Sequence, residues 1–178
     1  MKSKISVLVA LACLIMLPIL AWASDLPEQK PGLYVNKEYR FSVAYPENWQ
    51  SNTLRPGEVL RAANPNMYSL PVITASVSDQ KKGASLDVNV FLEAAKQAEP
   101  GSDGYKVVSR NDVTLNDGTP GKVFTYQWTW SDGFTELVTG ALITIKDGKY
   151  FSSTATTLVG GETKPEQLVE MVKRWKFY

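Results

Sequence analysis

Apolar and polar residues alternate along much of the N-terminal half of this chain. The clearest example is Tyr39–Tyr45, where every second residue from Phe41 onward (Phe41, Val43, Tyr45) is large and apolar. This period of two predicts a half-buried strand. Three further strands are predicted nearby, at residues 33–35, 58–63 and 71–77. Polar turns and loops separate them, at residues 36–38, 51–57, 64–66 and 78–84.

The spacing of apolar residues becomes helical at residues 87–99. The residues that repeat at i, i+3, i+4 and i+7 are Val88, Phe91, Leu92 and Ala95. They form one apolar face of a helix. Asp87 or Ser85 can cap its start, and Pro100-Gly101 ends it.

A second helix is predicted near the C-terminus. Residues 163–166, Thr-Lys-Pro-Glu, have the Thr-x-x-Glu form of a capping box, with proline in the first turn. The apolar residues at helical spacing are Leu168, Met171, Val172 and Trp175. We therefore expect the helix to continue through Trp175 and to bury this stripe in the core.

Three Asp-Gly turns recur between the two helices. They are Asn116-Asp117-Gly118, Ser131-Asp132-Gly133 and Lys146-Asp147-Gly148. Asp-Gly supplies the positive φ angles that tight hairpins need. Strand-like segments flank the turns, at residues 105–115, 122–130, 134–145 and 150–158. The sequence therefore predicts an antiparallel β-meander within a single α+β domain of residues 33–178, with helices packed on the faces of the sheet.

The first residues read as a secretory signal peptide. A basic start, Met1–Lys4, precedes the apolar run Ile5–Leu20, and small residues flank Trp22 in Ala21-Trp22-Ala23. We predict cleavage between Ala23 and Ser24, followed by a flexible arm at residues 24–32. Two alternatives remain open. The apolar run is long enough to stay as an uncleaved membrane anchor, or Cys13 is lipidated, since Ala10-Leu11-Ala12 before it resembles a lipobox.

The composition excludes several kinds of chemistry. The chain has no histidine, and its one cysteine, Cys13, lies in the leader. The mature chain therefore has no disulfide, no His or Cys zinc site and no Ser-His-Asp or Cys-His catalysis. Removal of Lys2 and Lys4 changes the net charge from +1 to about −1. That balance does not favour nucleic acid or an anionic membrane surface as a partner.

Two sets of residues are candidate binding groups. The aromatic residues of the strand at 122–130 share one face: Phe124, Tyr126, Trp128 and Trp130. They are either core packed against a helix, with the opposite polar face in solvent, or a platform for a sugar or an apolar ligand. We favour core for this face, with Trp130, beside the turn, the most exposed ring. The second set is Asp117, Asp132 and Asp147, which are turn residues or, less favoured, carboxylates for calcium.

The segment Tyr39–Trp49, YRFSVAYPENW, resembles the opening signature of the PsbP-like domains, which are named for an extrinsic protein of the photosynthetic oxygen-evolving complex. The resemblance extends over most of residues 33–178 and implies an α-β-α sandwich around an antiparallel sheet. In that fold Pro46 ends a strand and Trp49 closes the sheet edge. Tyr45 and Trp49 are therefore interpreted mainly as structural, with a partner or ligand surface at this corner as the alternative.

The resemblance implies an exported, non-catalytic accessory module that binds an envelope or membrane-complex protein. The histidines proposed to bind metal in plant members have no counterpart here. A small-ligand protein that uses the aromatic strand is the second hypothesis, and a carboxylate-based hydrolase is the third. We expect a monomer without a cofactor, in the periplasm, outside the cell, or in the thylakoid lumen of a photosynthetic host.

Overall fold

The computed structural model describes residues 26–65, 70–80 and 85–178. The predicted signal peptide, its cleavage site between Ala23 and Ser24, and Cys13 lie outside these residues. Neither helix in this part of the chain has the length and hydrophobicity of a membrane-spanning segment.

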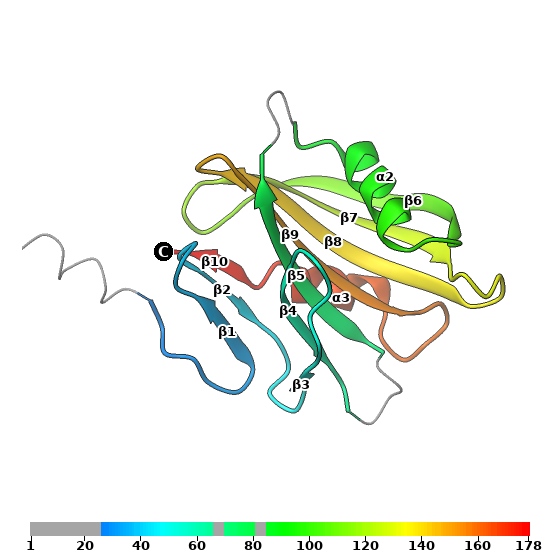
Figure 1. Cartoon of the computed structure of the whole chain (residues 1–178), viewed down its shortest axis with the longest axis horizontal. Helices are drawn as coiled ribbons and strands as arrows, with labels where there is room; N and C mark the ends of the chain where they lie inside the picture. Colours follow the sequence, from blue (N-terminus) through cyan, green and yellow to red (C-terminus); the bar gives the residue numbers. More distant parts are fainter. Residues whose placement is uncertain (1–25, 66–69, 81–84) are drawn as a thin grey trace, which may run out of the picture.

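A seven-stranded antiparallel sheet forms the centre of the domain, in the order β3-β4-β5-β9-β8-β7-β6 (Figure 1). Its strands are β3 (Gln50–Ser51), β4 (Glu58–Ala63), β5 (Val72–Asp79), β6 (Asp103–Thr114), β7 (Pro120–Thr129), β8 (Glu136–Lys146) and β9 (Lys149–Leu158). The last four strands are the predicted meander, with its Asp-Gly turns in the predicted places. β9 also pairs with β5 over eight residue positions, which joins the N-terminal strands to the meander.

A smaller antiparallel sheet has the order β1-β2-β10. Its strands are β1 (Leu33–Asn36), β2 (Phe41–Ala44) and β10 (Trp175–Phe177). The predicted extension of the C-terminal helix through Trp175 is therefore wrong. Trp175 pairs with Val43 in strand register, and its ring stacks on Phe41 with 4.2 Å between the ring centroids. This long-range pairing outweighs the helical spacing of the local sequence.

Two helices cover opposite faces of the large sheet, α2 (Val88–Ala98) in front and α3 (Pro165–Val172) behind in Figure 1. Asp87 caps α2 as predicted, because its carboxylate accepts a hydrogen bond from Asn89 N at 2.8 Å. The predicted Thr163–Glu166 capping box of α3 is wrong by one residue. Lys164 is the N-cap residue, and its backbone N–H donates to the side chain of Gln167 at 2.8 Å. The α+β class and the sandwich of helices around a sheet are confirmed.

Both faces of β7 are buried where the two helices pack. Phe124, Tyr126 and Trp128 lie under α2, as the core interpretation predicted. The prediction that the opposite face meets solvent is wrong for Val123 and Thr125, which are only 2% and 3% exposed. Val123 belongs to the core shared by α3 and the small sheet, and the Thr125 hydroxyl is hydrogen bonded to Ser109 at 2.8 Å.

Candidate functional site

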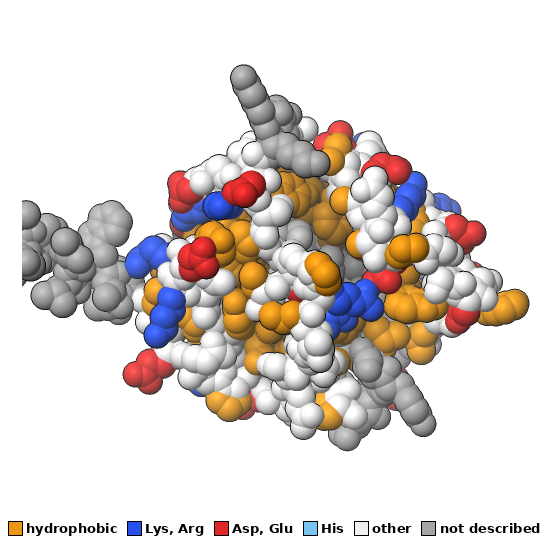
Figure 2. All heavy atoms as spheres, in the orientation of Figure 1, with side chains coloured by type: hydrophobic (Ala, Val, Ile, Leu, Met, Phe, Trp, Pro, Cys, Tyr) orange, Lys and Arg blue, Asp and Glu red, His pale blue; other side chains and the backbone are white. Residues whose placement is uncertain are grey.

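A cleft of about 720 Å³ lies on the face of the large sheet that carries α2. Helix α2 forms one side of the cleft, and the loop between β3 and β4, which contains Arg55 and Pro56, reaches the opposite side. Strands β5, β8 and β9 run beneath it. Figure 2 shows this face, on which hydrophobic side chains surround a basic group near the centre of the view. A volume of this size falls in the range of small-molecule sites, roughly 300–1,000 Å³.

Aromatic rings form one end of the cleft. Trp128 stacks on Tyr105 of β6 with 5.6 Å between centroids and 16° between ring planes. Trp130 follows at 5.5 Å from Trp128 and is only half-buried. Phe91 of α2 meets Tyr126 edge to face at 6.1 Å. The inner rings are therefore fixed by one another, and Trp130 presents ring surface to the cleft.

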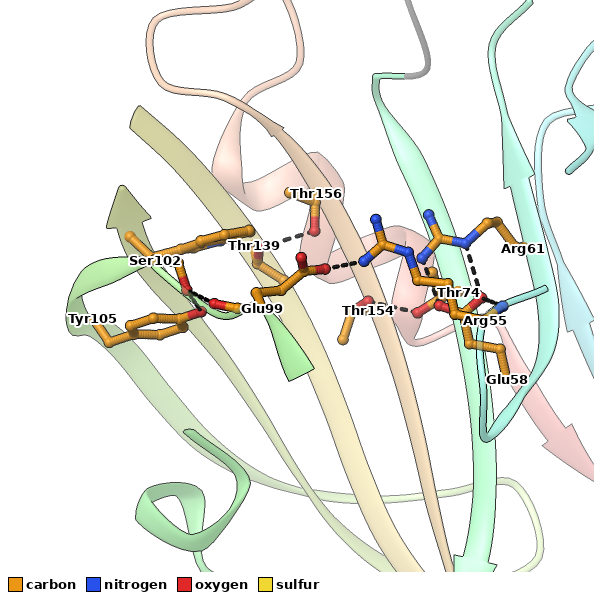
Figure 3. Close-up of polar contacts among 11 residues, drawn as sticks. Arg55, Glu58, Arg61, Thr74, Glu99, Ser102, Tyr105, Thr139, Thr154 and Thr156 are labelled. Carbon is orange, nitrogen blue, oxygen red and sulfur yellow. Dashed lines mark hydrogen bonds and ion pairs between the residues drawn. The ribbon is translucent and has the colours of Figure 1, made fainter. Parts of the chain in front are cut away.

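Threonine hydroxyls lie along the floor of the cleft. Thr74 of β5 is paired in register with Thr154 of β9, and their hydroxyls are 2.7 Å apart. Thr139 of β8 stands opposite Thr156 of β9, with 2.9 Å between their hydroxyls (Figure 3). The period of two along β9 places Thr154 and Thr156 on the same face. The floor therefore combines methyl groups with groups that both donate and accept hydrogen bonds.

The row of threonine hydroxyls is connected to the core by a hydrogen bond from the Trp128 indole. The Nε1–H of Trp128 donates to Oγ1 of Thr139 at 3.0 Å. Thr139 is only 1% exposed, so the structure supplies this buried N–H with the partner that it needs. Since Thr139 accepts from Trp128, its own hydrogen is available to Thr156, which is half-buried at the cleft surface.

Charged side chains stand around the cleft in pairs. Arg55 forms an ion pair with Glu99 at the end of α2, which connects the two sides of the cleft (Figure 3). Arg61 donates to both carboxylate oxygens of Glu58, at 2.8 and 2.6 Å. Glu58 also accepts from the backbone N–H of Arg55 at 2.9 Å, which holds the loop turn in place. The two arginines are therefore neutralised by two glutamates.

The end of α2 is anchored at the cleft by a second contact. The hydroxyl of Ser102 donates to the backbone carbonyl of Glu99 at 2.5 Å and lies 2.8 Å from the hydroxyl of Tyr105. Burial raises the pKa of Tyr105, and the Ser102 hydrogen bond opposes that rise only in part. Tyr105 is therefore a neutral hydrogen-bonding group at ordinary pH.

The three aromatic residues predicted as a surface do not lie together. Trp130 lines the cleft, whereas Tyr45 and Trp49 belong to the core between the large and small sheets, each 8% exposed. Tyr45 N–H donates to the Gly32 carbonyl at 2.8 Å, and Trp49 N–H to the Pro46 carbonyl at 3.0 Å. This placement agrees with the structural interpretation of the Tyr-Pro-x-x-Trp segment.

Two of the three turn aspartates, Asp132 and Asp117, accept hydrogen bonds within their own turns. Asp132 accepts hydrogen bonds from the backbone N–H groups of Phe134 and Thr135, at 2.9 and 2.8 Å, and from the Thr135 hydroxyl at 2.6 Å. These bonds lower the Asp132 pKa. Asp117 accepts from Thr119 and pairs with Lys146 at 2.6 Å. Across residues 26–65, 70–80 and 85–178, no group of three acidic, His or Cys side chains is arranged to hold a metal ion.

Sequence reasoning missed most of the cleft. The polar face of β9 is visible in the alternation of FSSTATTL, in which Thr154 and Thr156 occupy every second position. That pattern predicted a strand but did not indicate that Thr74 and Thr139 would stand beside it. The Arg55–Glu99 pair joins residues 44 positions apart in the sequence, and no local sequence pattern predicts it.

Comparison with solved structures identifies the fold class as PsbP-like. The chain is similar to the solution structure of cyanobacterial PsbP (CyanoP) from Synechocystis sp. PCC 6803, with a TM-score of 0.63 and 15% identity over 84% of this chain and 95% of that one. At this identity the likeness defines the fold alone, and it agrees with the resemblance of Tyr39–Trp49.

Two further structures are more distant. One is a crystal structure from Bacteroides thetaiotaomicron VPI-5482, with a TM-score of 0.43 and 15% identity over 84% of this chain and 49% of that one. The other is a protein of unknown function from Pseudomonas aeruginosa, with a TM-score of 0.40 and 18% identity over 80% of this chain and 88% of that one. No family profile and no curated protein sequence matches the chain.

Proposed function

We propose that this protein is an exported, non-catalytic accessory module that works by binding, and that the cleft beside α2 is its binding site. The main support for this proposal is the cleft itself. It has a volume of about 720 Å³, a half-buried tryptophan at one end and a row of threonine hydroxyls along its floor. Convergent polar groups in a largely preformed apolar cleft are typical of small-molecule sites. The signal-peptide pattern of residues 1–23 supports export.

The state of the carboxylates favours binding over hydrolysis. Carboxylate catalysis needs one acid whose pKa is raised enough to donate a proton. Among the carboxylates that line the cleft, Glu58 and Glu99 are held by arginines, and hydrogen bonds lower the pKa of Asp132. The carboxylates that line the cleft therefore do not support the carboxylate-hydrolase hypothesis.

Retention of a small molecule tests this proposal. The chain would be expressed with its leader, purified from the exported fraction, and weighed by native and denaturing mass spectrometry. We expect a ligand mass that is present only in the native spectrum. The variant Ala95→Trp should abolish it, because Ala95 lines the cleft from α2.

Ala94→Trp is the matched control, because Ala94 is the exposed neighbour on the same helix and does not line the cleft. If the exported wild type carries no molecule, and no compound shifts its tryptophan fluorescence in an Ala95-dependent manner, the cleft is not a binding site. The N-terminal residue of the purified chain tests export separately, and Ser24 is the expected first residue.

A partner protein is the second candidate, and one side chain favours it. Phe134, at the tip of the β7–β8 hairpin, is 90% exposed, and the turn beneath it is held by Asp132. Exposed aromatic residues on rigid supports are frequent anchors of protein interfaces. In-cell crosslinking of the tagged protein should capture one dominant envelope protein, and Phe134→Ala should weaken that capture. Unchanged capture with Phe134→Ala excludes this anchor.

A further inference from the structure

The chemistry of the cleft points to one class of ligand, and we infer that this ligand is a neutral saccharide. The inference rests on the proposed binding function of the cleft and extends it. A sugar ring has an apolar face of C–H groups and an edge of hydroxyl groups. A site for it therefore needs an aromatic surface beside groups that both donate and accept hydrogen bonds.

The aromatic surface is supplied by Trp130. Its ring is half-buried, and the Trp128–Tyr105 stack behind it holds it from one side. Its backbone N–H donates to the Thr135 carbonyl at 2.8 Å, so the hairpin end fixes the position of the residue. A preorganised ring can pack against the C–H face of a sugar with little loss of side-chain freedom.

The hydrogen-bonding edge is supplied by the threonine pairs. Each hydroxyl carries one hydrogen and two lone pairs. In the Thr74–Thr154 pair, one hydrogen is used between the two oxygens. The pair therefore retains one donor hydrogen and several lone pairs, and the Thr139–Thr156 pair adds Thr156 at the cleft surface. Groups that donate and accept side by side match the hydroxyls of a sugar, which also do both.

The charge balance of the cleft argues against a charged ligand. Arg55 is paired with Glu99 and Arg61 with Glu58, so neither arginine presents an unbalanced positive charge to an anion. The remaining carboxylate of the lining, Asp132, is occupied by Thr135 and two backbone N–H groups. Guanidinium and carboxylate groups in such pairs still have hydrogen-bonding capacity for neutral hydroxyls.

The hydroxyl floor argues against a lipid tail. A hydrocarbon chain lying over Thr74, Thr154 and Thr156 would remove their hydroxyls from water without replacing those hydrogen bonds. A sugar would replace them. The same floor is therefore expected to select a polyhydroxylated ligand over an aliphatic one of equal size.

Direct binding measurements test this inference. The mature full-length chain would be screened on an array of neutral oligosaccharides, and each hit measured by titration calorimetry beside a uronic acid trimer and palmitate. We expect a neutral oligosaccharide to bind, and the charged trimer and palmitate to bind at least tenfold more weakly. Trp130→Ala should weaken sugar binding at least tenfold. Thr154→Val should weaken it several-fold and leave palmitate binding unchanged or stronger.

Phe134→Ala is the matched aromatic control, because Phe134 is exposed on the same hairpin and outside the cleft. Its sugar affinity should stay within twofold of the wild type. If palmitate or another non-sugar binds in a manner blocked by Ala95→Trp, and no neutral saccharide binds at millimolar concentration, the saccharide inference is wrong and the binding function stands. If no tested compound binds and Ala95→Trp changes no measured binding, both the saccharide inference and the proposed binding function are wrong.

Discussion

The hydrogen bond from the Trp128 indole to Thr139 should contribute measurably to the stability of the cleft. Thr139→Val replaces the hydroxyl with a methyl group of similar size and so removes its hydrogen bonds to Trp128 and Thr156. The buried Tyr126 hydroxyl, which also hydrogen bonds to the Thr139 side chain, loses that partner too. Trp128 is 7% exposed, and water cannot readily take the place of the missing acceptor. A buried donor left without a partner costs about 1–3 kcal/mol.

Thr156→Val provides the comparison. It removes the bond between the two threonines but leaves Thr139 as acceptor for Trp128. Thr139 keeps a partner, so the expected cost is less than about 1 kcal/mol. The two variants lose chemically identical groups from neighbouring strands. They differ in whether the indole N–H and the Tyr126 hydroxyl keep Thr139 as a hydrogen-bond partner.

Urea unfolding followed by tryptophan fluorescence measures both variants. With a slope of about 1–3 kcal/mol per molar urea, Thr139→Val should lower the unfolding midpoint by roughly 1 M, and Thr156→Val by clearly less. In a Trp128→Phe background, Thr139→Val should cost less than it does in the wild type, since no indole N–H is left unpaired. Equal costs for the two threonine variants, or the same Thr139→Val cost in both backgrounds, would refute this reasoning.

Three further predictions concern the scaffold outside the cleft. Gly140→Ala should destabilise the fold by about 1–3 kcal/mol in urea unfolding, because the added Cβ would lie 2.9 Å from the α3 backbone. An unchanged unfolding midpoint would contradict the close packing of β8 against α3. Asn116→Ala should cost about 1–3 kcal/mol by the same assay, because the Asn116 side chain both donates to the Phe177 carbonyl and accepts from its N–H, at 3.0 and 3.1 Å. Asp117→Asn should lower stability at pH 6 by about 1 kcal/mol or less, because it loses the charge paired with Lys146. Burial raises the Asp117 pKa, but hydrogen bonds from Lys146 and Thr119 outweigh burial and lower the pKa below 3.8. The stability difference between Asp117→Asn and the wild type should therefore vanish as the pH falls from about 4 toward 2. A stability difference that persists at pH 2 would exclude the ion pair as its cause.

Local patterns predicted the secondary structure well where a single short-range interaction decides it. Asp-Gly turns form the hairpins of the meander because the aspartate and glycine conformations suit tight turns, as Asp147 and Gly148 show with φ of 49° and 72°. Asp87 caps α2 through a hydrogen bond to a residue two positions away. Neither outcome depends on distant parts of the chain.

The prediction failed where distant residues compete with the local pattern. Trp175 has helical spacing from Leu168, yet it lies in β10 because pairing with Val43 and stacking on Phe41 bury it more completely. The sequence pattern predicts only a turn at Asn116. In the structure its side chain also hydrogen bonds to the backbone of Phe177, 61 positions away in the sequence.

The sequence by itself determined most of the elements, the α+β class and the absence of histidine chemistry, because periodicity, turns and missing residue types are local or compositional facts. It also indicated Trp130 as the exposed ring of the aromatic strand. The tertiary structure alone decided where the cleft lies, since the pairing of β5 with β9 places Thr74 beside Thr154, and the Arg55–Glu99 pair joins a loop to α2. The cleft consists of contacts between residues far apart in the chain, and their proximity is a property of the fold.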